Sequence, residues 1–369
     1  MVKMKKENIQ FRILYFIGIF MIVAGHVGGG GFSLFYEFFP AKSFHLALFI
    51  FCSGYFFINY EHKEVLYVIK KKIKSLIIPL YVWNIIYGIV VLILHKFGFR
   101  IGMELSINTL LILPIYNGHQ FLFNLASWFI WPLFIIEVIN IFIIKLLNKK
   151  DLNYYFYFFF SLIIGFLGVQ LAINGYNKNW LLLLVKIMYF YPFFSFGMLY
   201  RKSLEKYDKL NNKMYFLIIV SLALVNIYIF NGTVIYVPAW CNTFDNFYRP
   251  FIVGFLGILF WLRVAKILVP SLKNNGVMNL ISKNTFSIMM HHLMGFFLLN
   301  TFWFLTNRYF GLWPGFKSKN YFSDIYYSYL PKNLYQFKFL YVVVGISFSL
   351  LILKLENKIK NYKKNKSFS

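Results

Sequence analysis

Apolar runs of about 20 residues recur along the whole chain, and short segments rich in lysine separate them. A helix rises about 1.5 Å per residue, so a run of this length can cross the hydrocarbon core of a bilayer. The apolar stretch 101–116 is shorter, carries Glu104 and stops at Pro114, which favours a re-entrant or interfacial segment. The pattern predicts ten membrane spans, at residues 11–29, 44–60, 76–95, 126–147, 154–174, 181–200, 214–231, 248–268, 284–305 and 338–355.

Composition narrows the class of protein. The 369 residues are 60% hydrophobic, 22% aromatic and 14% charged, whereas soluble domains are about 45–50% apolar and about 25% charged. A soluble enzyme is therefore excluded, and so is a disordered chain, because disorder requires low hydrophobicity. Two cysteines exclude a disulfide scaffold, and 47 Phe and 28 Tyr do not suit a nucleic-acid binder. The sequence predicts an all-α polytopic membrane protein with about ten transmembrane helices.

The net charge of +26 indicates topology. Ten spans place both termini on one side. With the termini in the cytoplasm, 27 Lys and Arg fall in inner segments and nine in outer loops, while Lys186 and Arg249 lie within or at the edge of spans. The positive-inside rule supports this orientation. We therefore predict one integral-membrane domain over 1–369, with a basic cytoplasmic tail at 356–369, in the inner (cytoplasmic) cell membrane.

Polar side chains inside the apolar runs are few, and each is a candidate for function because such a group is costly in lipid. His26 ends the first span and His45 begins the second, so both are expected toward the outer leaflet, where two imidazoles can meet. Imidazole suits proton abstraction because its pKa lies near neutral pH. The alternative is that each histidine only hydrogen-bonds a neighbouring helix. The full set is His26, His45, Asn84, Glu137, Lys186, Arg249, His291 and His292.

The first span carries a polar stripe. Tyr15 precedes His26 by eleven residues, close to three helical turns, and Arg12 precedes it by fourteen. One face of this helix therefore has a cation at the cytoplasmic surface and an imidazole about 21 Å higher. The lysines at 70–74 abut the third span on the same side. Composition favours an ordinary membrane anchor there, and the alternative is a dock for the phosphates of a cytosolic ligand.

The sequence also bears on nucleophilic catalysis and on metal binding. Cys52 lies near His45 and can act as a nucleophile, but a small buried core thiol is the favoured interpretation. A metal site is not predicted, because His, Asp and Glu do not occur at i, i+4 spacing.

Taken in order, several stretches resemble the acyltransferase 3 family of bacterial multi-pass membrane acyltransferases. The first span ends in Ile-Val-Ala-Gly-His26, and the second carries Phe44-His45 followed by Ser53-Gly54-Tyr55. Further similarity lies in residues 72–83, 128–134, 191–197 and 282–292. Within the family, the chain looks most like the branch of fucose 4-O-acetylase-like and capsule or exopolysaccharide O-acetyltransferases.

The resemblance implies transfer of an acyl group, usually acetyl, from cytosolic acyl-CoA to a hydroxyl of a glycan or lipid-linked sugar. It implies a catalytic role for His26, and it raises the docking interpretation of lysines 70–74 above the anchor. The chain also departs from the family. Arg12 and Tyr15 stand where an acidic and a basic residue are common, and Ser75 replaces one of two paired arginines. Lysine cannot match the bidentate fork of arginine.

These considerations predict a site. His26 is expected to be the general base, with His45 orienting it or stabilising an oxyanion. The expected donor-binding residues are Arg12, Lys71, Lys72 and Lys74, and the secondary candidates are Tyr15, Ser53, Asn84, Glu137 and His292.

The predicted partners are acetyl-CoA or another acyl-CoA as donor substrate, a polysaccharide or lipid-linked sugar acceptor, and the bilayer. No bound cofactor, metal or nucleic acid is expected, and a homodimer stays an alternative. Direct transfer is expected, while an acyl-enzyme on histidine or Cys52 stays open. The competing function is a multi-pass transporter or flippase of a glycan or lipid-linked intermediate, and a non-catalytic scaffold is a third.

Overall fold

The computed structural model describes residues 8–27, 35, 38–60, 62–146, 153–324, 327 and 332–366, and all regular structure in these ranges is helical. Nine of the described helices are long and apolar enough to cross a membrane. Each coincides with a predicted span. The predicted span 44–60 corresponds to a tenth, shorter apolar helix, Ala41–Phe57. The predicted all-helical membrane protein is therefore confirmed. The last three residues of the predicted basic tail lie outside the described ranges.

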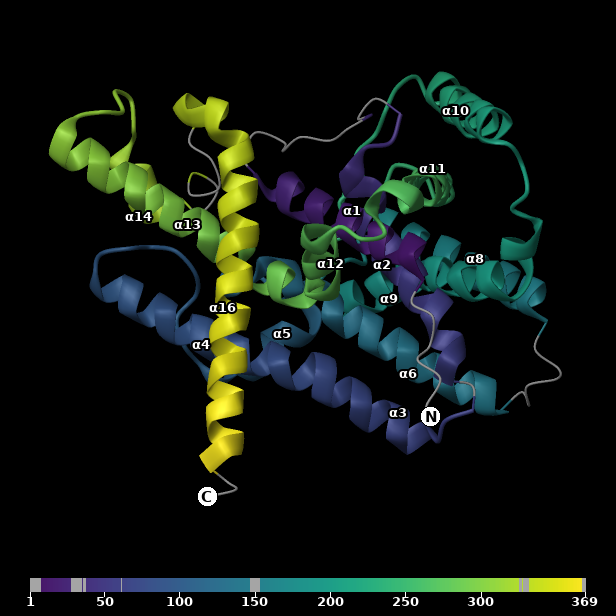
Figure 1. Ribbon diagram of the computed structural model, residues 1–369, viewed down its shortest axis with the longest axis horizontal. Helices are drawn as coiled ribbons and strands as arrows, with labels where there is room; N and C mark the ends of the chain where they lie inside the picture. The colour runs from purple at the N-terminus through teal and green to yellow at the C-terminus, as the bar shows by residue number, and fades with distance from the viewer. Residues whose placement is uncertain are drawn as a thin grey trace.

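The long helices follow one another along the chain, and shorter ones connect them (Figure 1). Helix α3 (Val65–Lys72) continues through a π-helical turn, Ile73–Ile77, into α4 (Ile78–Lys96). The shorter helices are α2 (Ala41–Phe57), α5 (Leu113–Tyr116), α12 (Gly276–Lys283) and α14 (Ser318–Ser323). The other long helices are α1 (Ile9–His26), α6 (Ile130–Leu146), α8 (Tyr154–Ile173), α9 (Asn179–Leu199), α10 (Asn212–Ile229), α11 (Arg249–Leu272), α13 (Thr285–Phe310) and α16 (Lys338–Lys366).

Asparagine side chains begin four of these helices. Asn8, Asn153, Asn211 and Asn275 accept hydrogen bonds from backbone N–H groups in the first turns of α1, α8, α10 and α12. Such caps satisfy N–H groups that have no partner inside a helix. All four lie beside lysine-rich connections, so the ends of the helices are fixed on the face that the charge pattern assigns to the cytoplasm.

Helices α1, α2 and α9 form the interior of the molecule, and α10 lies at its edge (Figure 1). The span that contains α9 is 78% buried, whereas those of α10 and α16 are 17% and 28% buried. Small residues let α2 and α9 approach closely. A Cβ on Gly54 would lie 2.0 Å from the carbonyl oxygen of Phe194, and one on Gly197 would lie 2.1 Å from that of Phe51. Close backbone contact of this kind stabilises helix pairs in lipid.

The segment between α4 and α6 includes the stretch 101–116, for which the sequence predicts a re-entrant or interfacial position. It lies against α4 and leaves residues 103–108 exposed, and we call it the re-entrant segment. It forms the π-turn Asn108–Ile112 and then α5. Asn84 of α4 is fully buried and donates to the carbonyl oxygens of Thr109 and Leu110, at 3.3 and 2.8 Å. It also accepts a 2.5 Å hydrogen bond from Gln120. Backbone at membrane depth needs partners inside the protein, so Asn84 has a structural role in anchoring this re-entrant segment.

Candidate active site

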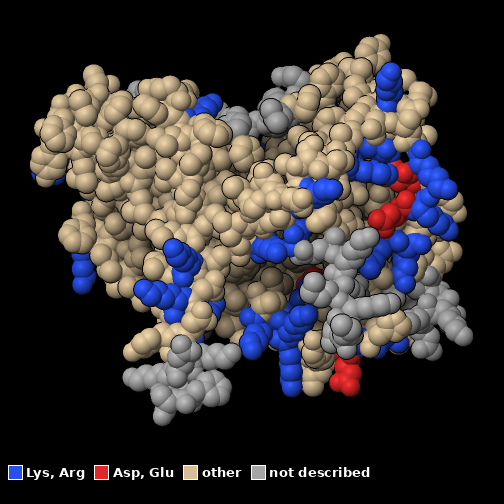
Figure 2. Space-filling model, viewed as in Figure 1, with Lys and Arg blue, Asp and Glu red and all other residues tan. Residues whose placement is uncertain are grey.

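A cavity of about 350 Å³ opens between α1, α2, α3 and α6, and we call it the lysine pocket. Figure 2 shows Lys and Arg side chains gathered on the lower and right-hand parts of the face it draws, with few at the upper left. Five predicted site residues from separate parts of the sequence meet in this pocket. Its lining consists of Tyr15, Ser53, Phe56, Phe57, Tyr60, Lys63, Tyr67, Lys71, Lys72 and Glu137.

The lysine pocket contains more positive than negative side chains. The ammonium of Lys72 lies 2.5 Å from Oε1 of Glu137, which is 2% exposed. Oε2 of the same carboxylate is buried and has no hydrogen-bond partner among the described residues. The ammonium groups of Lys71 and Lys72 both lie over the ring of Tyr60, at 5.3 and 5.2 Å from its centroid. With Lys63, three cations face one carboxylate, so the pocket favours an anionic ligand.

Two predicted donor-binding residues lie elsewhere. The guanidinium of Arg12 donates a 2.7 Å hydrogen bond to the side chain of Asn279 on α12. Lys74 lies on the exposed π-turn after α3. Neither residue belongs to the lining of the lysine pocket. The four predicted donor-binding residues therefore divide into Lys71 and Lys72, which line the pocket, and two residues outside it.

His26 lies at the C-terminal end of α1 and contacts His292 of α13. Nδ1 of His26 is 3.3 Å from Nε2 of His292, and the two ring centroids are 5.0 Å apart. Each ring also bonds its own helix. Nδ1 of His26 lies 2.7 Å from the carbonyl oxygen of Ile22, and Nδ1 of His292 lies 2.8 Å from that of Ile288. We call His26 and His292 the histidine pair.

These contacts assign the tautomers of the histidine pair. A carbonyl oxygen only accepts, so Nδ1 carries the proton in both rings. Nε2 of His292 is then a lone-pair acceptor and faces the N–H of His26. Nε2 of His26 is also a lone-pair acceptor, and none of the described residues donates to it. The pair therefore presents one basic nitrogen, with a fixed N–H on the opposite side of the same ring.

The other two helical histidines have different partners. Nδ1 of His45 lies 2.5 Å from the carbonyl oxygen of Ala41 in its own helix. Nδ1 of His291 and the hydroxyl of Tyr87 form a 2.8 Å hydrogen bond, and the His291 ring centroid lies 4.1 Å from that of Trp83. The histidine that contacts His26 across helices is His292 of α13, whereas the hydrogen bond of His45 stays within α2. His292, a secondary candidate in the sequence, takes the place beside His26.

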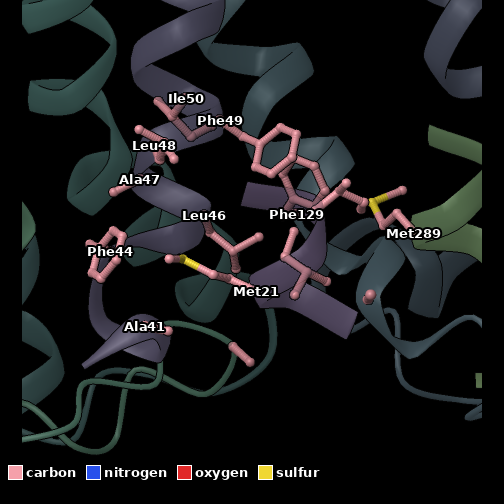
Figure 3. Close-up of a cluster of buried hydrophobic side chains, with 14 of the residues drawn as sticks. Met21, Ala41, Phe44, Leu46, Ala47, Leu48, Phe49, Ile50, Phe129 and Met289 are labelled. Carbon is pink, nitrogen blue, oxygen red and sulfur yellow. The ribbon is translucent and has the colours of Figure 1, made fainter. Parts of the chain in front are cut away.

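An apolar layer separates the lysine pocket from the histidine pair. On α1 the chain passes from Tyr15 in the pocket to His26, and on α2 it passes from Ser53 in the pocket to His45. The ring of Phe49 fills the space between, 5.5 Å from the ring of Tyr15, and a Cβ on Gly18 would lie 2.7 Å from it. The layer consists of Met21, Leu46, Phe49, Phe129 and Met289, which lie together in Figure 3.

Sequence analysis missed His119, which lies on the loop between α5 and α6. Its ring is 6% exposed and stacks on Trp240, with centroids 4.0 Å apart. Burial, together with the nearby Lys186 and His26, lowers the pKa of His119 to about 3. The preceding Gly118 has φ +76°, and a Cβ there would lie 2.7 Å from Cα of Trp128. His119 lies outside the apolar runs, in a loop of ordinary polar composition, so its local sequence gives no sign that the ring is buried.

Comparison with protein families gives the class of protein. The family model Acyl_transf_3, described as an acyltransferase domain, matches residues 9–316. The chain belongs to the acyltransferase 3 family. No curated protein and no solved structure matches the chain. This acyltransferase is therefore a membrane-bound, multi-pass enzyme that uses an acyl donor. The family match encloses the lysine pocket, the apolar layer and the histidine pair.

In the part of the acyltransferase that the structure describes, no three side chains of His, Cys, Asp or Glu converge on a position where they could hold a metal ion. Cys52 is buried in the hydrophobic core and does not line the lysine pocket. The chemical groups that the site does present are a cationic pocket and a basic imidazole nitrogen.

Proposed function

We propose that this acyltransferase moves an acetyl group from cytosolic acetyl-CoA to a hydroxyl of a surface polysaccharide or lipid-linked sugar. It would do so in the cytoplasmic membrane, with the lysine-rich face toward the cytoplasm. The proposal places the chain in the branch of capsule and exopolysaccharide O-acetyltransferases. Its support is the resemblance of the motifs to that branch and the geometry of the site.

One observation carries the proposal: α1 joins an anion-binding pocket at one end to a basic nitrogen at the other. Tyr15 lines the lysine pocket, and His26 follows eleven residues later on the same helical face, about 16 Å away by helix rise. A donor with phosphates at one end and a thioester at the end of a long flexible arm matches this spacing. The phosphates would bind Lys71 and Lys72, and the arm would pass the apolar layer.

The tautomer of His26 supplies the proton chemistry. Nε2 takes the proton of the acceptor hydroxyl as its oxygen attacks the thioester carbonyl. The imidazolium that forms keeps its Nδ1–H bonded to Ile22 and His292, so the positive charge is stabilised without rotation of the ring. When the tetrahedral intermediate collapses, the carbon–sulfur bond breaks. The CoA thiolate then takes the proton from Nε2, and His26 returns to its starting state.

The tautomer of His45 favours a different role from the one expected from the sequence. Because Nδ1 of His45 donates to Ala41, its Nε2 is an acceptor in the neutral ring. An oxyanion needs a hydrogen-bond donor, so neutral His45 is better suited to accept a hydrogen bond from the acceptor sugar. We assign it to acceptor binding.

The test is His26→Gln, compared with wild type at equal protein level. We expect acetylation of the cell-surface glycan and release of CoA thiol from purified protein to fall by a factor of about 100 to 10,000, as for loss of a general base. His62→Gln, at an exposed position between α2 and α3, is the control and should keep full activity. Full activity of His26→Gln would remove His26 from the mechanism. Sugar transport without thiol release would favour the transporter.

A further inference from the structure

Four buried polar side chains and the half-buried Asn117 lie in or beside the re-entrant loop, and none of them lines the lysine pocket. We call them the re-entrant polar cluster: Asn117, His119, Gln120, Asn124 and Lys186. Asn124 is fully buried, Lys186 is 1% exposed and Gln120 is 2% exposed. Four of the five come from one short loop, and Lys186 comes from the middle of α9. No step of the mechanism above uses any of them.

Lys186 is a buried cation that has no counter-ion among the described residues. Its ammonium donates to the carbonyl oxygen of Tyr116 at 3.3 Å and lies 4.5 Å from the ring centroid of Trp128. No carboxylate in the described part of the chain lies within ion-pair distance of it. Charged side chains inside membrane proteins normally pair with an opposite charge. The expected partner of Lys186 is therefore an anion that comes from outside the chain.

The neighbouring polar atoms also lack partners. Nε2 of His119, Oε1 of Gln120 and both side-chain polar atoms of Asn124 are buried, and none forms a hydrogen bond within the described ranges. Buried polar groups are almost always hydrogen-bonded. Together these atoms offer both donors and acceptors, and a sugar hydroxyl both donates and accepts. The set thus matches a polyhydroxylated ligand better than an apolar one.

The re-entrant polar cluster lies between the surface and the helix that carries His292. His119 stacks on Trp240, which is 39% exposed, and Tyr116 packs against Trp180, which is 54% exposed. On the inner side, Phe123 of the same loop packs against Phe297 of α13, with ring centroids 5.1 Å apart. The loop therefore extends from exposed aromatic rings to the helix that carries His292.

We propose that the re-entrant polar cluster is the acceptor subsite, and that the acceptor carries a negatively charged group, a carboxylate or a phosphate, that binds Lys186. The hydroxyls of the same sugar would bind the partner-free atoms of the loop, with one hydroxyl directed at Nε2 of His26. An acidic sugar supplies a carboxylate, and a lipid-linked sugar supplies a phosphate. This inference rests on the proposed transfer to a sugar hydroxyl. It specifies in addition that the acceptor sugar is negatively charged.

The experiment measures binding without any acyl donor. Purified full-length protein in phosphatidylcholine nanodiscs is titrated with methyl β-glucuronide, glucose 1-phosphate and the neutral methyl β-glucoside, and apparent affinity is read from thermal stabilisation. We expect at least one charged sugar to bind about ten times more tightly than the neutral one. Preference for the glucuronide indicates an acidic sugar, and preference for the phosphate indicates a lipid-linked one.

Lys186→Met tests the residue itself, and Lys178→Met is its matched control. Lys178 is exposed at the N-cap of the same helix. The preference for charge should vanish in Lys186→Met and persist in Lys178→Met. Methionine has a similar length and carries no charge, so the variant should fold at least as well as wild type. Should it not fold, the three-sugar comparison on the wild-type protein still decides.

Two results overturn the inference. One is that neither charged sugar binds wild-type protein more tightly than methyl β-glucoside. The other is that the preference for charge survives in Lys186→Met. Either result leaves acetyl-CoA turnover by the wild-type protein untouched, whereas absence of that turnover would overturn the proposed function instead.

Discussion

The lysine pocket and the histidine pair hold their polar groups in opposite ways. In the pocket, ammonium groups on flexible stems lie around an opening, and one of them is paired with the carboxylate of Glu137. In the pair, each ring is fixed by a carbonyl oxygen four residues earlier in its own helix, and His292 is fully buried. Point charges near water attract a ligand, whereas proton transfer needs a ring that is already oriented. We therefore expect substitutions in the lysine pocket to change the KM for the donor, and substitutions in the histidine pair to change kcat.

The largest effect is expected at the buried end. In His292→Leu the N–H of His26 loses its lone-pair acceptor, so kcat should fall by about 10- to 100-fold while the KM for acetyl-CoA stays the same. The double variant with His26→Ala should be no slower than His26→Ala alone, because the two rings act as a unit. Thiol-release kinetics on purified protein measure both. Additive losses would mean that His292 acts independently of His26.

The next effect concerns pH. Burial lowers the pKa of His119 from its ordinary value of about 6.5 to about 3. Between these values the unfolded chain binds a proton that the folded protein does not, so stability falls as pH drops below about 6.5. From pH 7 to pH 5 the loss should be about 2 kcal/mol. Thermal unfolding at both pH values should show a smaller drop for His119→Gln than for wild type. An equal drop would show that His119 does not titrate in this way.

A smaller effect is expected at the lysine pocket. Lys71→Ala should raise the KM for acetyl-CoA roughly tenfold, the loss of one charge-assisted hydrogen bond, and leave kcat unchanged. Acetyl-pantetheine lacks the phosphates of CoA, so the Lys71→Ala substitution should not change the KM for acetyl-pantetheine. Lys273→Ala, at an exposed position after α11, is the control. A fall in kcat without a change in KM would place Lys71 in the chemistry instead of donor binding.

A test of Lys72 has to include its ion-pair partner Glu137. Lys72→Met alone leaves Glu137 buried without its ion-pair partner, so it should lower stability as well as donor affinity. Adding Glu137→Gln should restore the unfolding temperature but not the KM. If the double variant recovers both, the effect of Lys72 on the donor is only structural.

The smallest effect is expected from the apolar layer between the two regions. Phe49→Ala removes the ring that lies against Gly18, so the passage toward His26 should widen. The ratio of butyryl-CoA to acetyl-CoA turnover should rise a few-fold, because one or two methylenes in an apolar site are worth only about 1–3 kcal/mol. The measurement is the ratio of kcat/KM values. An unchanged ratio would place the acyl chain on another route.

Much of the fold could be predicted from the sequence because lipid imposes a strict rule. Each backbone N–H and C=O group in lipid needs a hydrogen-bond partner, and a helix provides these partners within one segment. The ten apolar runs therefore form helices, with α2 shorter than the others. The candidate site could be predicted only in part. His26, Lys71 and Lys72 stand in apolar or basic runs whose surroundings single them out. His119 stands in a loop of ordinary polar composition, and nothing in its immediate sequence indicates that it is buried.

The sequence by itself determined the class of the protein, the positions of its helices and the polar residues that lipid makes costly, because these follow from local hydrophobicity and charge. Only the tertiary structure decided which of these residues meet. It placed His292 against His26, and it brought Glu137 to Lys72 across 65 positions of the chain. Such pairings depend on how helices cross and rotate, and these are set by side-chain packing between segments far apart in sequence.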